Sequence, residues 1–201
     1  MTAPFFPVSL NLIGRLCVVI GEADDREAID KERALRESGA DVRWFQHPAE
    51  MSDDDVSGAY FVISTPQDES LSARLRGLAD RYKFLLCCID QPAYGFVAMA
   101  AIAKAGPVRI AISTTGLAPR VGKNLRDALQ RAMDATFIRF IECLATQKTR
   151  VKAANPGLEA SAIRRKAMIA AATGFDADIA FRYPAWFDEE LARALPRIEE
   201  R

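Results

Sequence analysis

The stretch LCVVIGEADDREAIDKERALRESGADVRWF, residues 16–45, decides the fold. It begins with five apolar residues, which predict a buried strand that ends at Gly21. Residues 24–38 then carry apolar side chains at helical spacing, and Gly39 is a typical helix stop. Residues 42–45 predict a second strand. A strand, a helix and a strand in this order predict a parallel pair joined by a crossover helix.

The same alternation continues to residue 113. Residues 60–64 and 84–89 predict two further strands, with a helix at 70–82 between them. Residues 8–10 could add a short edge strand, and we expect a strand at 108–113 to close the sheet. The first half therefore predicts an α/β fold with a Rossmann-like parallel sheet.

The second half is predicted to be helical. Helical patterns cover residues 119–146, 158–173 and 184–199, and no strand-like run reappears after Gly116. Asn155, Pro156 and Gly157 are adjacent turn formers and mark a boundary within this half.

Composition excludes several classes of protein. The 201 residues are 50% hydrophobic, enough for one ordinary domain with an appendage, and 27 basic residues balance 27 acidic ones. No overall field recruits nucleic acid or a membrane surface. The apolar run at 95–103 is far shorter than the roughly 20 residues of a membrane helix. The four cysteines lack paired spacing, so we expect a cytoplasmic protein with buried thiols.

Three separated segments resemble one family. They are LCVVIG with AIDKERALRESGADV in residues 16–42, FVISTPQDESLSARL with LLCCID in 61–90, and IAISTTGLAPRVGKNLRDALQ in 110–130. Together they are similar to the siroheme synthase N-terminal family of precorrin-2 dehydrogenases and sirohydrochlorin ferrochelatases. The third segment is the most specific, because the family's pattern there is close to S-T-G-G-x-S-P.

The resemblance implies an architecture and a chemistry. It implies a dinucleotide-binding domain at 1–113, a dimerisation segment at 114–152 and a small helical domain at 153–201, in a homodimer. The implied chemistry is NAD-dependent oxidation of precorrin-2 to sirohydrochlorin, followed by insertion of ferrous iron as a substrate. Two alternatives stay open, namely an NAD-independent chelatase and a non-catalytic dimer that binds a tetrapyrrole.

Asp90 is the candidate catalytic residue. It ends a predicted buried strand, and ligands gather at the carboxyl ends of parallel strands. A carboxylate there can accept protons, and Asp90 matches the aspartate that the family uses in both activities. The alternative is an ordinary turn-forming aspartate before Gln91 and Pro92.

A polar turn after the last predicted strand is the candidate substrate site. Its hydroxyls and backbone N–H groups precede a helix, where they can hold the carboxylates of a tetrapyrrole, and basic side chains in the first helical turns can pair with them. The alternative is ordinary helix capping with solvated basic residues. These candidates are Ser113, Thr114, Thr115, Gly116, Arg120 and Lys123.

The turn after the first strand departs from the family. The family has three consecutive glycines there, whereas this chain keeps Gly21 alone and adds Glu22, Asp24 and Asp25. Carboxylates repel phosphate, and side chains keep the backbone from approaching it. The residues alone favour Asp24 or Asp25 as a helix N-cap, so NAD stays a doubtful expectation of the resemblance.

The resemblance nevertheless gives a set of cofactor-binding candidates around that turn. His47, the only histidine, follows the second strand, and an exposed loop histidine is the alternative. No His, Cys and Asp cluster has metal-ligand spacing, so no resident metal is expected. The cofactor candidates are Gly21, Glu22, Ala23, His47, Pro48 and Thr65.

Overall fold

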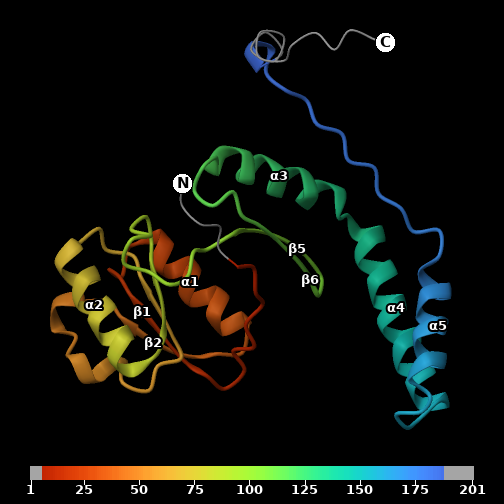
Figure 1. Ribbon diagram of the computed structural model, residues 1–201, viewed down its shortest axis with the longest axis horizontal. Coiled ribbons are helices and arrows are strands. Elements are labelled where there is room, and N and C mark those ends of the chain that lie inside the picture. Colours follow the sequence, from red (N-terminus) through yellow and green to blue (C-terminus); the bar gives the residue numbers. More distant parts are fainter. Residues whose placement is uncertain (1–5, 188–201) are drawn as a thin grey trace, which may run out of the picture. The chain divides into compact units, whose positions relative to one another are not determined.

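The computed structural model describes residues 6–187 and divides into two compact units, residues 1–138 and 139–201. The first unit is built on a four-stranded parallel sheet (Figure 1). Its strand order is β2 (Asp41–Phe45), β1 (Leu16–Ile20), β3 (Phe61–Ser64) and β4 (Leu85–Cys88). The predicted α/β class with a Rossmann-like parallel sheet is confirmed.

Both faces of this sheet are covered. Helices α1 (Arg26–Glu37) and α2 (Glu69–Tyr82) lie on opposite sides of the strands (Figure 1). Successive strand residues alternate between the faces, so two buried apolar clusters form. Strand residues Val18 and Ile20 pack with Leu75 of α2, whereas Cys17 and Val19 pack with Ala28 of α1.

Two short 3-10 helices follow β2. They span Pro48–Glu50 (η1) and Asp53–Val56 (η2), and Val56 is fully buried against the α2 side of the sheet. Their packing fixes the chain that leaves the carboxyl end of β2.

The prediction that a strand at 108–113 closes the main sheet is wrong. Strand β6 (Val108–Ile112) pairs antiparallel with β5 (Ala101–Ala105) in a separate two-stranded sheet. Only two residues separate the strands, and Gly106 adopts a φ of +52°, so the chain reverses. A parallel neighbour would instead need a crossover of roughly a dozen residues or more. The edge strand predicted at 8–10 is also absent, since these residues form coil whose Leu10 packs on the core.

The predicted helix at 119–146 is two helices. α3 (Pro119–Ala132) ends before Met133, which is buried against β5, and α4 (Ala135–Ala154) follows. The Asp134 carboxylate accepts a hydrogen bond from the Phe137 N–H at 2.8 Å, so this aspartate caps α4 and separates the helices.

The second unit contains most of α4 and α5 (Ser161–Ala172). The predicted break at 155–157 is confirmed, and Gly157 has a φ of +84° there. Arg164 Nη1 closes this turn by donating to the carbonyls of Asn155 at 2.7 Å and Gly157 at 2.6 Å. Most of the helix predicted at 184–199 lies outside the described residues, and the three-part domain boundaries stay a prediction. In residues 6–187, no helix has the length and apolar character needed to span a membrane.

Candidate functional site

Asp90 and the polar turn that begins at Ser113 line one pocket of about 410 Å³, here called the Asp90 pocket. β4 leads into Asp90 and β6 leads into Ser113, so the ends of strands from two different sheets meet there. Its volume is typical of small-molecule sites. All five of the candidates Asp90, Ser113, Thr114, Thr115 and Gly116 line this pocket.

Asp90 lies in a tight turn that is fixed from both sides. Its φ is +58°, a left-handed conformation that aspartate and asparagine tolerate better than most residues. The Gln91 N–H donates to the Cys88 carbonyl at 3.2 Å. Gln67 Nε2 donates to the Ile89 carbonyl at 3.0 Å, and the Ser72 hydroxyl donates to the Gln91 side chain. These hydrogen bonds therefore fix the backbone that carries the exposed Asp90 carboxylate.

The turn at 113–116 also has unusual backbone geometry. Thr115 has a φ of +50° and Gly116 a φ of +77°. The Ser113 hydroxyl accepts the Thr115 N–H at 3.2 Å. The N-cap of α3 is Ala118, so none of these hydroxyls caps the helix, whereas the exposed basic side chains agree with the helix-capping alternative.

The structure does not bring the two basic candidates of α3 into the Asp90 pocket. Arg120 and Lys123 are exposed and do not line it. Lys31 of α1 lines it instead, with Glu27 one turn earlier. The Lys31 Nζ lies 2.6 Å from the Glu27 Oε1. The four-residue spacing of Glu27 and Lys31 predicts one helix face, but nothing in the sequence shows which pocket that face borders.

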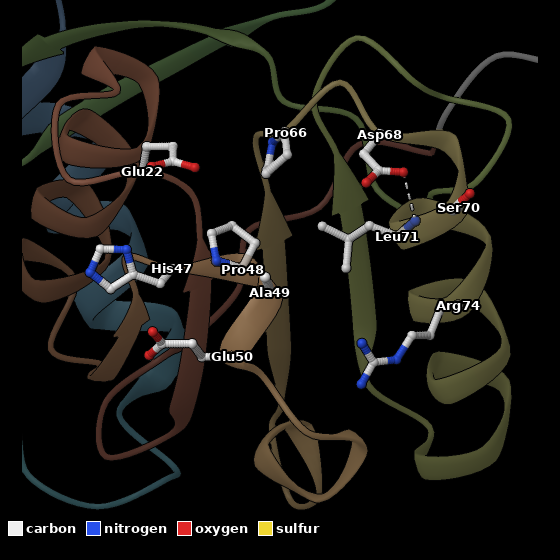
Figure 2. Close-up of a pocket in the computed structure, with 10 residues that line it drawn as sticks. All are labelled: Glu22, His47, Pro48, Ala49, Glu50, Pro66, Asp68, Ser70, Leu71 and Arg74. Atoms are coloured by element: carbon white, nitrogen blue, oxygen red, sulfur yellow. Dashed lines mark hydrogen bonds between the residues drawn. The ribbon is translucent and has the colours of Figure 1, made fainter.

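A second pocket of about 660 Å³ lies beyond the carboxyl ends of β1, β2 and β3 (Figure 2). Figure 2 shows Glu22, His47 and Glu50 on one side and α2 residues on the other. Of the cofactor candidates, Glu22, His47 and Pro48 line this His47 pocket, whereas Gly21, Ala23 and Thr65 do not.

The charge of the His47 pocket is unfavourable for an anion. Its lining includes the carboxylates of Glu22, Glu50 and Asp68. Arg74 also lines it, but the Arg74 Nη2 pairs with Asp53 at 2.6 Å and donates to the Met51 carbonyl at 3.0 Å. The pocket is therefore large enough for a small ligand, but its carboxylates repel the phosphates of a nucleotide.

At the turn after β1, a carboxylate of the chain caps the helix that follows. Asp25 is the N-cap of α1, and its Oδ1 accepts the Glu27 N–H at 2.8 Å. Its Oδ2 accepts a hydrogen bond from the Thr65 hydroxyl. The pKa of Asp25 is lowered chiefly by the hydrogen bond from Thr65; partial burial opposes this shift, and hydrogen bonds from backbone N–H groups add to it. The N-cap interpretation of this aspartate is confirmed.

Gly21 is packed closely by the chain on several sides. Its N–H donates to the Phe45 carbonyl at 3.1 Å, and its carbonyl accepts the Trp44 indole N–H at 2.9 Å. A Cβ on Gly21 would lie 2.8 Å from the Ala28 Cβ and closer still to the Thr65 hydroxyl. This glycine is therefore held by close packing of β1 against α1. Because the Asp25 carboxylate already accepts the N–H at the start of α1 and repels phosphate, the residues of this turn do not fit the pyrophosphate of NAD.

The expectation of buried thiols is confirmed for Cys17, Cys87 and Cys88 and is wrong for Cys143, which is exposed on α4. Burial raises the pKa of Cys17 and of Cys87 to about 11. These thiols are therefore protonated and unreactive at neutral pH. In the described part of the chain, no group of three or more His, Cys, Asp or Glu side chains could hold a metal ion.

No protein-family model matches the chain. Its sequence is similar to curated siroheme synthases: 25% identical over 177 residues to that of Nitrosococcus oceani, covering 79% of this chain and 37% of the relative. The identity is 27% to the siroheme synthase of Thioalkalivibrio sulfidiphilus, and the match covers 77% of this chain and 35% of that relative. It is 28% to that of Gluconacetobacter diazotrophicus, covering 77% and 37%. The chain thus spans little more than a third of these relatives' lengths.

A solved structure described as SirC, precorrin-2 dehydrogenase, has a similar fold. The TM-score is 0.64 and the sequence identity 15%, and the match covers 94% of this chain and 98% of that one. At this sequence identity, the likeness shows the fold alone.

Proposed function

We propose that this chain, whose resemblance to the siroheme synthase N-terminal family is confirmed by its curated relatives, inserts ferrous iron into sirohydrochlorin in the Asp90 pocket. One observation carries the proposal most directly. Asp90 and the turn at 113–116 come from separate segments and line the same pocket. Metal insertion needs a proton acceptor and a grip on an anionic macrocycle, and these two segments offer both.

Asp90 supplies the proton chemistry. When Fe²⁺ enters the macrocycle, two pyrrole N–H bonds break and four Fe–N bonds form, so two protons leave for each metal ion. A carboxylate beside the macrocycle accepts each proton in turn. Because Asp90 is exposed, it can pass the first proton to water before it takes the second.

The turn at 113–116 binds the carboxylates of the macrocycle. Its hydroxyl and backbone N–H groups stand just before the first turn of the 14-residue helix α3. Helix N-termini favour anions, and the tetrapyrrole carries several carboxylates. Hydrogen bonds from this turn therefore orient the macrocycle relative to Asp90.

Oxidation of precorrin-2 is the second candidate. The observation that favours it is the His47 pocket, which lies where α/β sheets of this kind bind nucleotides. Because carboxylates stand at the turn after β1 and line the His47 pocket, we assign no step of the reaction to NAD.

The family resemblance also supports a cytoplasmic homodimer that acts without nucleic acid or membrane. The buried, unpaired cysteines are typical of a reducing compartment. Residues 114–152 are the proposed dimerisation segment.

The test is anaerobic iron insertion into sirohydrochlorin, followed by the change in its absorption spectrum. Asp90→Asn keeps the shape and tolerates the left-handed backbone, but it cannot accept the proton. We expect it to lower the rate by about a hundredfold or more. The control is Asp30→Asn, which removes an exposed carboxylate of α1 outside the pocket. Equal rates for Asp90→Asn and wild type would contradict the assignment.

A further inference from the structure

We propose that Lys31 binds a carboxylate of the tetrapyrrole, so that α1 forms a third wall of the substrate site beside Asp90 and the turn at 113–116. The inference rests on the proposed function of the Asp90 pocket and assigns a binding residue to it. It replaces Arg120 and Lys123, which the sequence places near the site but which do not line the pocket.

Charge is the first argument. Among the described residues that line the Asp90 pocket, Lys31 is the only lysine or arginine, and Glu27 and Asp90 are the only acids. A polyanionic substrate entering beside two carboxylates needs a counter-charge. Lys31 is the one lining side chain that can supply it.

The position of Lys31 is the second argument. Its side chain is only 20% exposed, whereas that of its partner Glu27 is 46% exposed. The positive charge of Lys31 also opposes the burial that raises the pKa of Cys87, another residue of the pocket wall. The ammonium group is therefore held near the wall of the pocket.

The Glu27 ion pair prepares Lys31 for this role. An ammonium group has three donors, so it can keep Glu27 and still bind a second carboxylate. Glu27 is the exposed partner of this pair, so a substrate carboxylate can also take its place beside the ammonium group. Either way, the helix holds the lysine in place before the substrate arrives.

The experiment is an equilibrium titration of the full chain with sirohydrochlorin, without metal, followed by absorption. We expect Lys31→Met to raise Kd by about tenfold or more, since a charged hydrogen bond is lost. Lys31→Arg keeps the charge and should restore most of the affinity. The matched control is Arg33→Met on the same helix, whose guanidinium pairs with Asp30 and lies outside the pocket. We expect Arg33→Met to leave Kd within about twofold.

The outcomes separate the two proposals. Wild-type affinity in Lys31→Met, or an equal loss in Arg33→Met, would overturn the role of Lys31 and leave the Asp90 pocket intact. Failure of the wild-type chain to bind sirohydrochlorin would overturn the proposed function itself. Lys31→Gln is a second variant without the charge, and circular dichroism compares its helix content with that of wild type. A raised Kd with unchanged helix content shows that the loss does not come from unfolding of α1.

Discussion

Asp25 has two carboxylate oxygens, and each accepts a hydrogen bond from the chain itself. One binds the Glu27 N–H and the other binds the Thr65 hydroxyl, so β3 and the start of α1 are joined through a single side chain. In a dinucleotide-binding protein, a phosphate oxygen takes this place at the helix N-terminus. The carboxylate therefore stabilises the turn and occupies hydrogen-bond donors at the start of α1.

The first residue-scale prediction concerns the cap. Asp25→Ala removes the side-chain acceptor of the Glu27 N–H, and we expect it to lower the free energy of unfolding by about 1 kcal/mol. Urea unfolding measures the change. The control is Asp24→Ala, an exposed neighbour that is not the N-cap, and it should change stability by less than about 0.5 kcal/mol. An equal effect of both variants would show that Asp25 is not the cap.

The second prediction is the pH dependence of that cap. The hydrogen bond from Thr65 lowers the pKa of Asp25 in the folded chain below its ordinary value of 3.8. The stabilisation is therefore complete above the unfolded pKa and is lost as the pH falls through the lower, folded pKa. We expect the difference in stability between wild type and Asp25→Ala to be constant near neutral pH and to shrink below about pH 4. A difference that grew on acidification would contradict this sign.

At the scale of elements, the β5–β6 hairpin and α3 position the turn at 113–116. Gln130 of α3 donates from Nε2 to the Lys104 carbonyl at 2.7 Å and accepts the Lys104 N–H at 2.9 Å. This side chain thus pairs with the free edge of β5 as a neighbouring strand would. Buried Ala103 and Met133 complete the contact.

Gln130→Ala tests this contact. It removes both hydrogen bonds to Lys104, and we expect about 1 kcal/mol of lost stability with faster amide exchange in β5. Lys123→Ala on the same helix is the control, since Lys123 is exposed and does not contact β5 through these bonds. Unchanged exchange in β5 after Gln130→Ala would show that other contacts hold the hairpin to α3.

The elements that sequence predicted correctly have strong local signals. β1, β3 and β4 are nearly continuous apolar runs because both faces of the sheet are covered. The hairpin was mispredicted because its first strand, AIAKA, is rich in alanine and carries little strand preference. The end of α3 was missed because Met133 is buried by packing on β5, which no local pattern reveals.

At the scale of the whole molecule, only some residues of the Asp90 pocket could be predicted from the sequence. Asp90 and Ser113 could be predicted because polar residues directly follow strands. Lys31 could not, because only the packing of α1 decides which pocket its face borders. The acidic residues of the turn after β1 are visible in the sequence. The hydrogen bond between Thr65 and Asp25 is not, because it joins residues 40 positions apart.

On our proposal, this chain binds a tetrapyrrole in the Asp90 pocket and does not bind NAD at its acidic turn. Calorimetric titration of the wild-type chain with NAD tests it most directly. We expect no saturable heat up to millimolar NAD, because the carboxylates at the turn after β1 and in the His47 pocket repel a pyrophosphate. A saturable titration with a micromolar Kd would contradict the account.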